Sequence, residues 1–357
     1  MRKRDCKNTI LTSFALGNYG TRHVIAFPAV KERHLFTAAL KRYQPDTPKR
    51  ALFRYWLKFA AQLHLPGIWS TVSSTQLEEV VGFRFIDWLV AVSKVFANGS
   101  PLPVFIWPPE PSRKRIYIHL LNRKGDALGF AKIAFDSENN NKLQIECETL
   151  ITLARVDYKT FHVPSVIDNG EFDNNSFLIV EPVPDTVKTY RASNIGFPSE
   201  AVKEYAGPIQ AVSYDQVEKK DWWNRFVQKI DEGSGFIKNL RTIATDEKIR
   251  LCRIHGDMGP SNLLQNDGQL WIIDWEESVE KGPYLTDYVS FYLALNRKQV
   301  MKKAHTVLPK MISEFSSGPH YAKPIDIMMA LAFLRGAKFT LASKLIDIWP
   351  EKEKPWL

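Results

Sequence analysis

The sequence predicts an α+β protein in which a small antiparallel sheet with one helix precedes a mainly helical region. Two observations favour this fold class. Lys114–Leu121 and Leu128–Phe135 are rich in β-branched and aromatic residues and flank a polar turn, Arg123-Lys124-Gly125-Asp126, which is typical of a hairpin. Beyond residue 185, most segments carry apolar residues at helical spacing. With 357 residues, the chain is long enough for two or three domains.

The first region, residues 1–100, is predicted to be a helical extension. Glu32–Tyr43 and Lys49–Leu63 have apolar residues at helical spacing, and prolines at 45 and 48 separate them. The turn-forming stretch Asn98-Gly99-Ser100-Pro101 then marks a boundary.

The sheet is expected in residues 101–182 and the helical part in residues 183–357. Besides the hairpin, the second region should contain a polar loop, Asp136–Asn141, a helix, Lys142–Arg155, and a strand, Phe177–Val180. In the third region, the single exception to helix is a strand–turn–strand around Leu263–Asp274, with Asn266-Asp267-Gly268 as its turn.

Composition limits the possible classes of protein. Apolar residues make up 45% of the chain and charged residues 24%, as in ordinary globular proteins. The two most apolar stretches, Val80–Ala97 and Met328–Ile346, are interrupted by charges, so no integral membrane segment is expected. Three widely spaced cysteines argue against disulfides and zinc. These features predict a cytoplasmic protein.

The net charge of +9 is compatible with anionic partners such as nucleotides, acidic glycans, membrane headgroups or nucleic acid, but an effect on solubility alone is the default interpretation. The Lys and Arg residues are scattered, and we find no basic stripe interleaved with aromatic residues. A nucleic-acid-binding protein is therefore not favoured. A peripheral membrane contact and the oligomeric state stay open.

The strongest signal for chemistry is the stretch Ile254-His255-Gly256-Asp257-Met258-Gly259-Pro260-Ser261-Asn262, followed twelve residues after the asparagine by Asp274 in Ile273-Asp274-Trp275-Glu276. One carboxylate that accepts a proton from a hydroxyl, together with a carboxylate and an amide oxygen that hold magnesium, is what phosphoryl transfer requires. The predicted hairpin would return the chain so that Asp274 lies beside Asn262.

This pattern resembles the signature of the aminoglycoside phosphotransferase and choline kinase superfamily, in which His-Gly-Asp, four variable residues and Asn precede Ile-Asp-Trp-Glu. The resemblance implies a two-lobed, protein-kinase-like fold and a kinase that uses ATP and Mg²⁺. It implies that Asp257 is the catalytic base and that Asn262 and Asp274 are magnesium ligands. His255 is expected to support the loop by hydrogen bonding.

The same resemblance implies a lysine in the small sheet that holds the nucleotide phosphates. Lys132 is the lysine of the strand Leu128–Phe135, and a lysine in an apolar strand needs a partner when it is buried. Helical spacing places Glu146 at the edge of the apolar face of the following helix and turns Glu148 away from it. Glu146 is therefore the predicted partner, and Glu148 is expected on the surface.

Further positions follow from the resemblance. The segment around Glu181 and Val183 corresponds to the hinge, whose backbone groups would bind the adenine edge. Asp287 would brace the catalytic loop, although an aspartate there could equally begin a helix as its N-cap. The chain departs from the pattern because no glycine-rich phosphate loop is visible; Trp107–Arg115 stands at that place.

The sequence does not identify the acceptor. There is no Ala-Pro-Glu element after Asp274 and no arginine beside Asp257, which disfavours a protein substrate. The layout of the whole chain is similar to phosphotransferases of bacterial exopolysaccharide and capsule loci, so a sugar or polysaccharide precursor is the expected acceptor. Two alternatives stay open: a pseudokinase scaffold that binds nucleotide without turnover, and an antibiotic kinase acting on a cationic aminoglycoside.

Overall fold

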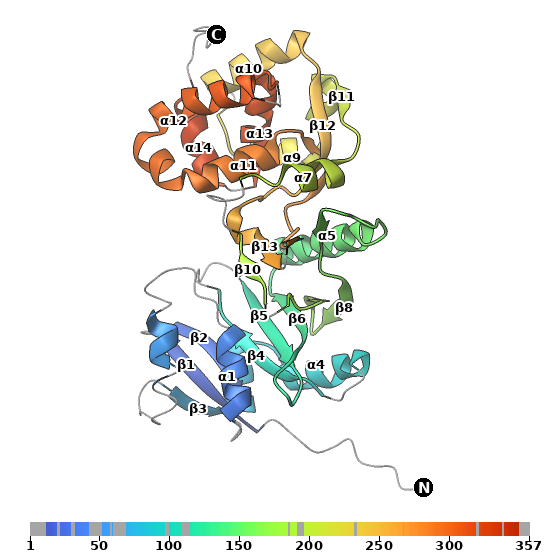
Figure 1. Cartoon of the computed structure of the whole chain (residues 1–357), viewed down its shortest axis with the longest axis vertical. Coiled ribbons are helices and arrows are strands. Elements are labelled where there is room, and N and C mark those ends of the chain that lie inside the picture. The colour runs from blue at the N-terminus through green and yellow to red at the C-terminus, as the bar shows by residue number, and fades with distance from the viewer. Residues whose placement is uncertain are drawn as a thin grey trace. The chain divides into compact units, whose positions relative to one another are not determined.

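The computed structural model describes residues 12–19, 22–29, 33–42, 52–57, 59, 69–96, 100–108, 114–184, 186–190, 196–231, 234–266, 268–318, 321–337 and 339–349. The chain divides into two compact units (Figure 1). Unit 1 comprises Met1–Cys147 and Pro164–Val183. Unit 2 comprises Glu148–Val163 and Pro184–Leu357.

Unit 1 is built on one eight-stranded sheet in which every neighbouring pair is antiparallel. The predicted hairpin is present as β5 and β6, and the strand predicted at residues 177–180 is β9. In spatial order the strands are β3 (Trp69–Ser73), β1 (Ser13–Tyr19), β2 (Arg22–Pro28), β4 (Leu102–Ile106), β5 (Arg115–Leu121), β6 (Ala127–Ala134), β9 (Asn175–Val180) and β8 (Val166–Phe172).

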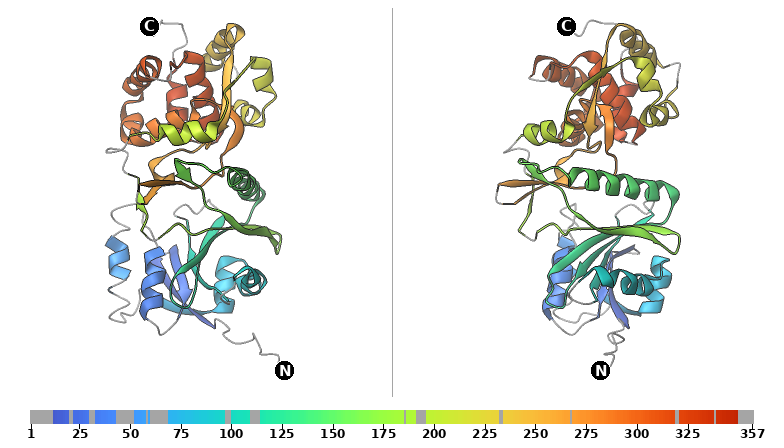
Figure 2. Two further views of the ribbon diagram at one scale, coloured as in Figure 1. Left: turned by 45° about the vertical axis from the view of Figure 1, so that its right-hand side comes forward. Right: turned by 90° about the vertical axis from the view of Figure 1, so that its right-hand side faces the viewer.

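The two faces of this sheet are covered by different helices. On β4, Phe105 packs into a cluster with α4 (Phe85–Val92), whereas its neighbour Val104 packs into a cluster with α1 (Arg33–Arg42). This is the alternation that a pleated strand imposes. Figure 2 shows α1 and α4 on opposite faces of the sheet. The middle of the sheet, around β4, is therefore buried on both sides.

The expectation that residues 1–100 are mainly helical is wrong for three segments. β1, β2 and β3 extend the sheet beyond β4. β1 and β2 contribute residues to the clusters on both faces, so the alternating pattern that identifies a half-buried strand is weak in them. β3 is a short edge strand whose Ser70, Thr71 and Ser73 are exposed, so it carries no apolar pattern at all. The helix expected at residues 32–43 is α1, the helix expected at residues 49–63 is described at residues 52–57, and α3 (Ser74–Val81) completes this part.

Helix α5 (Ser137–Leu153) begins five residues earlier than the predicted helix, within the expected polar loop. The Asp136 carboxylate accepts hydrogen bonds from the backbone N–H of Asn139 at 2.8 Å and from its side-chain amide at 2.7 Å. Such a cap satisfies a free N–H at the helix start and offsets the low helix propensity of the three asparagines that follow.

Unit 2 is mainly helical, as predicted. Its helices are α7 (Ser199–Ala206), α8 (Tyr214–Glu218), α9 (Asp221–Val227), α10 (Gly235–Asp246), α11 (Thr286–Leu295), α12 (Arg297–Ser317), α13 (Pro324–Gly336) and α14 (Thr340–Asp347). Nearly every residue of α13 is buried, and α9, α11 and α14 pack around it. An α+β protein with an antiparallel sheet followed by a helical part is thus confirmed.

The predicted hairpin at residues 263–274 is present as β13 (Leu263–Asn266) and β14 (Gln269–Ile272). It is not the single exception to helix, however. β10 (Lys188–Thr189) and β7 (Phe161–His162) flank it, and a second sheet pairs β12 (Ile249–Ile254) with β11 (Gln210–Val212) and β15 (Val279–Pro283).

Strand β12 is attached to the central helix α13 by an ion pair. The Arg250 guanidinium donates to the Asp326 carboxylate at 3.1 and 2.6 Å and lies over the Tyr284 ring at 4.5 Å. A two-pronged contact of this kind fixes orientation as well as distance. β12, whose last residue directly precedes the His-Gly-Asp motif, is therefore attached near its start to the core of unit 2. Among the described residues, no helix has the length and apolarity to span a membrane.

Candidate active site

The loop that follows β12 makes a sharp turn at Gly256. Its φ of +88° is in the left-handed region, and a Cβ built on it would lie 2.1 Å from the carbonyl oxygen of Glu277. Both the backbone conformation and the close approach of another backbone segment require glycine. The glycine of the His-Gly-Asp motif thus lets the loop fold tightly against the chain that follows Asp274.

A buried carboxylate holds this loop. Asp287, in the first turn of α11, accepts hydrogen bonds from the backbone N–H groups of His255 at 2.8 Å and Gly256 at 2.9 Å. The Tyr205 hydroxyl donates to the same carboxylate at 2.7 Å. Asp287 therefore braces the loop as expected. It is not the helix N-cap, since Leu285 occupies that position.

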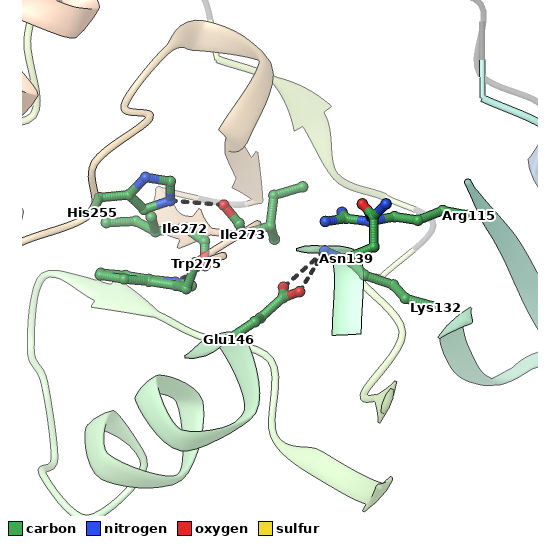
Figure 3. Close-up of polar contacts among 8 residues, drawn as sticks. All are labelled: Arg115, Lys132, Asn139, Glu146, His255, Ile272, Ile273 and Trp275. Atoms are coloured by element: carbon green, nitrogen blue, oxygen red, sulfur yellow. Dashed lines mark hydrogen bonds and ion pairs between the residues drawn. The ribbon is translucent and has the colours of Figure 1, made fainter. Parts of the chain in front are cut away.

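His255 bonds within the loop through one ring nitrogen and to the residue that follows the hairpin through the other, and Figure 3 shows this second contact, to Ile273. Its Nδ1 accepts from the Asp257 N–H at 3.3 Å, and its Nε2 donates to the Ile273 carbonyl at 2.9 Å. An N–H must donate and a carbonyl must accept, so these contacts select the neutral tautomer with the proton on Nε2. The ring also packs on Trp275. This is the supporting role expected of His255.

The three residues predicted to act on the phosphates and the hydroxyl come together within unit 2. Asn262 donates through its side chain to the Asp257 carbonyl at 2.8 Å, and its own carbonyl accepts from the Ile273 N–H at 3.0 Å. Asp274 is the next residue after Ile273 and has φ of +68°. Non-glycine residues in this conformation are uncommon and cluster at functional sites.

Negative charge is concentrated around Asp257. Burial and the carboxylates of Asp274, Glu277 and Glu276 raise the pKa of its carboxyl group from the ordinary value to about 7, against the opposing hydrogen bond from Asn262. Carboxylates that crowd together disfavour each other's ionised form. This group of oxygen ligands has the chemistry that Mg²⁺ prefers, and a cation there would relieve the repulsion. The residues present therefore fit a magnesium ion.

In unit 1, Lys132 on β6 and Glu146 on α5 form a buried ion pair (Figure 3). The Lys132 Nζ lies 2.9 Å from Oε1 and 2.7 Å from Oε2 of Glu146. Glu148 is exposed, in agreement with the helical-face argument. The contact is thus the one that was expected, while its role toward a nucleotide stays a prediction.

The expected hinge follows β9. The Glu181 N–H donates to the Ser165 carbonyl at 2.8 Å, so this group already has a partner. Among the described residues, no hydrogen bond uses the Glu181 carbonyl or the Val183 N–H. Binding of an adenine edge by the backbone around Glu181 and Val183 stays a prediction. Residues 109–113 of the segment that stands in place of a glycine-rich loop lie outside the described residues.

Sequence reasoning missed two residues that build the site. Tyr205 comes from α7, a helix with no recognisable motif; burial, reinforced by Asp287, raises the pKa of its hydroxyl well above the ordinary value, so the group remains a donor. Trp275 was noted only as a motif residue. It is fully buried, donates to the Ile272 carbonyl at 3.0 Å, and packs edge-on against Tyr205. A lone tyrosine in an amphipathic helix carries no signal of such a role.

Replacement of Gly256 by alanine should destabilise unit 2 strongly. The left-handed conformation alone costs about 1 kcal/mol for a residue with a Cβ, and the clash with a backbone oxygen adds on the order of 2 kcal/mol more. Gly268 is the matched control because its φ is +87° but nothing lies within 4 Å of its Cβ position. Calorimetric unfolding of both alanine variants measures the difference; equal losses would show that the close approach to Glu277 is unimportant.

No family model and no curated protein matches the sequence. In structure the chain is similar to aminoglycoside phosphotransferase APH(4)-Ia, solved with ADP and hygromycin B, at 12% identity over 73% of this chain and 94% of that one, with a TM-score of 0.45. It is also similar to aminoglycoside 2'-phosphotransferase-IIIa, solved with GDP, at 15% identity over 76% and 93%, with a TM-score of 0.42. A fructosamine-3-kinase-like protein of Haemophilus somnus follows at 14% identity over 69% and 96%, with a TM-score of 0.40. These likenesses are too distant to carry an argument about activity, so the proposal below depends on the chain's own residues.

Proposed function

We propose that this protein is a kinase that transfers a phosphoryl group from a magnesium-nucleotide, taken here as ATP, to a hydroxyl group of a small molecule. The observation that carries the proposal is the convergence of Asp257, Asn262 and Asp274 on a loop and a hairpin that are joined through the backbone of Ile273. Phosphoryl transfer depends on positioning and on neutralising charge, and this arrangement supplies the groups for both.

Each residue has a distinct role in the proposal. Asp257 orients the acceptor hydroxyl and takes its proton; burial, together with the neighbouring carboxylates, raises its pKa and makes it a better proton acceptor. Asn262 and Asp274 hold magnesium, which when bound neutralises charge on the nucleotide phosphates. Lys132, oriented by Glu146, binds the phosphates, and the backbone of Glu181 and Val183 binds adenine.

The acceptor is proposed to be a sugar hydroxyl on an anionic molecule such as a cell-surface polysaccharide precursor. Helix α11 packs against the catalytic loop, where a Cβ on Gly259 would lie 3.7 Å from that of Ala294. The chain that continues from α11 has no acidic residue between Asp287 and Glu314. Instead it exposes four cationic side chains: Arg297, Lys298, Lys302 and Lys303.

These cations favour an anionic acceptor over a cationic aminoglycoside. Among the described residues none of the four forms an ion pair, whereas Lys310, further along α12, pairs with Glu314 at 3.5 Å. A cationic surface attracts an anionic substrate and repels a cationic one. The antibiotic kinase is therefore the less favoured alternative.

Asp257→Asn should lower phosphoryl transfer by about 10²- to 10⁴-fold, the usual contribution of a positioned base. Binding of a non-hydrolysable ATP analogue with Mg²⁺ should be nearly unchanged, because Asp257 faces the hydroxyl in this mechanism. Transfer is measured with radiolabelled ATP or GTP, with water and candidate sugars as acceptors, and the exposed Asp246→Asn is the matched control. Retention of more than about a tenth of wild-type turnover would exclude the base role. Tight nucleotide binding without any turnover in the wild type would instead establish the alternative of a pseudokinase scaffold.

Lys132→Ala should weaken nucleotide binding by about 10- to 100-fold, since a hydrogen bond to a charged group is lost. Glu146→Gln should act in the same direction but more mildly, because it keeps the shape and removes only the charge that positions Lys132. Glu148→Gln is the matched control on the exposed side of α5. Calorimetric titration with the ATP analogue provides the affinities, and thermal unfolding confirms that the variants fold. A larger effect for Glu148→Gln than for Glu146→Gln would refute the assignment.

The acceptor class is tested with a charge-reversed variant, Lys298→Glu with Lys302→Glu. Transfer to an anionic sugar, such as an oligomer of glucuronic acid or a sugar phosphate, should fall and should weaken further with salt. Transfer to neutral glucose should be little changed. Lys310→Glu serves as the control. Turnover of kanamycin by the wild type, increased by the charge reversal, would establish the antibiotic kinase in place of the proposed acceptor.

A further inference from the structure

A short helix in unit 1 carries an apolar stripe on its outer face. Four large side chains are exposed there: Leu52 by 72%, Tyr55 by 65%, Trp56 by 47% and Phe59 by 50%. Their spacing of i, i+3, i+4 and i+7 places them on one side of a helix. Isolated apolar residues are common on protein surfaces, but a continuous stripe of this size marks an interaction site.

This stripe is not the face by which the helix packs on the protein. Leu57 is fully buried among strand and α1 residues, and Phe53, four positions earlier, packs against the same cluster. The helix is thus apolar on two sides, whereas a helix on a soluble surface presents a polar side to water. The Trp56 and Phe59 rings stack on each other at 5.9 Å between centroids and 21° between planes, so the outer stripe is a contiguous surface.

In the sequence around the stripe, the charged residues are of one sign. No acidic residue lies between Asp46 and Glu78, while Lys49, Arg50, Arg54 and Lys58 flank or interrupt the apolar positions. The Arg54 guanidinium lies 5.8 Å from the centroid of the Tyr55 ring. This stretch corrects the expectation that no basic segment is interleaved with aromatic residues. It has the composition of a helix that lies in a membrane interface: Trp, Tyr and Phe on one side, with Lys and Arg among them in the sequence.

We propose that the stripe formed by Leu52, Tyr55, Trp56 and Phe59 docks the protein on an anionic lipid surface. The apolar side chains would enter the headgroup region, and the flanking cations would pair with lipid phosphates. A second copy of the chain fits less well, because a two-fold contact would bring the same cations together. A nucleic acid also fits less well, since Trp56 and Phe59 turn their ring faces toward each other and not toward a base.

Flotation of the full chain with lipid vesicles tests the proposal. The protein should float with vesicles containing about a third phosphatidylglycerol, should not float with pure phosphatidylcholine, and should be released by salt. Tyr55→Ser with Trp56→Ser should weaken binding at least about tenfold. Arg50→Gln and Lys58→Gln should each weaken it about fivefold, the effect of one cation at an anionic surface. Val90→Ser, an equally exposed apolar position on α4, is the matched control.

Several outcomes would overturn the proposal. These are failure of the wild type to float with anionic vesicles, equal flotation with both vesicle types, or unchanged binding in the double-serine variant. Binding of single-stranded RNA without binding of vesicles would assign the stripe to a nucleic acid. A dimer that the double-serine variant dissociates, again without vesicle binding, would assign it to a second copy. Asp257→Asn should float like the wild type, so the result is independent of catalysis.

Discussion

The His-Gly-Asp loop depends on the buried carboxylate of Asp287. Two consecutive backbone N–H groups, those of His255 and Gly256, point to this one side chain. A buried N–H without an acceptor costs as much as a lost hydrogen bond, and a buried carboxylate without donors costs more. The Asp287 carboxylate therefore supplies the acceptor that the two N–H groups need, and they supply the donors that the carboxylate needs. Tyr205 supplies a third donor and closes the arrangement on the side of α7.

The loop is in turn joined to the hairpin by hydrogen bonds to the backbone of Ile273. His255 reaches the Ile273 carbonyl, and the Asn262 carbonyl receives the Ile273 N–H. Asp274 follows immediately, and the pairing of Leu263 with Ile272 keeps the two ends of the hairpin side by side. The twelve residues from Asn262 to Asp274 in the sequence thus correspond to the length of one tight hairpin. Local geometry explains why Asp257, Asn262 and Asp274 could be predicted together.

The Lys132–Glu146 pair could be predicted for a similar reason. A single lysine in an apolar strand needs a buried partner, and helical periodicity separates Glu146 from Glu148. Contacts between residues far apart in the sequence could not be predicted. Tyr205 reaches Asp287 across 82 positions of sequence, and no pattern in α7 identifies it. The strands β1 and β2 were missed because coverage on both faces removes the polar alternation by which strands are recognised, and β3 because it is a short, polar, exposed edge strand.

The net charge of +9 hides a division between sites of opposite sign. Carboxylates gather where a cation would bind, and their mutual repulsion is visible in the raised pKa of Asp257. Cations gather in two acid-free stretches, one that continues from α11 and one around the exposed stripe of residues 52–59. A charge that served solubility alone would be spread with its counter-ions. In the functions proposed above, the carboxylates would attract magnesium and the two acid-free stretches would attract anions. Net charge by itself therefore says little about partners. The two proposed partners differ because one acid-free stretch continues from the helix that packs on the His-Gly-Asp loop, which favours an anionic substrate, and the other contains an exposed apolar stripe, which favours a lipid surface.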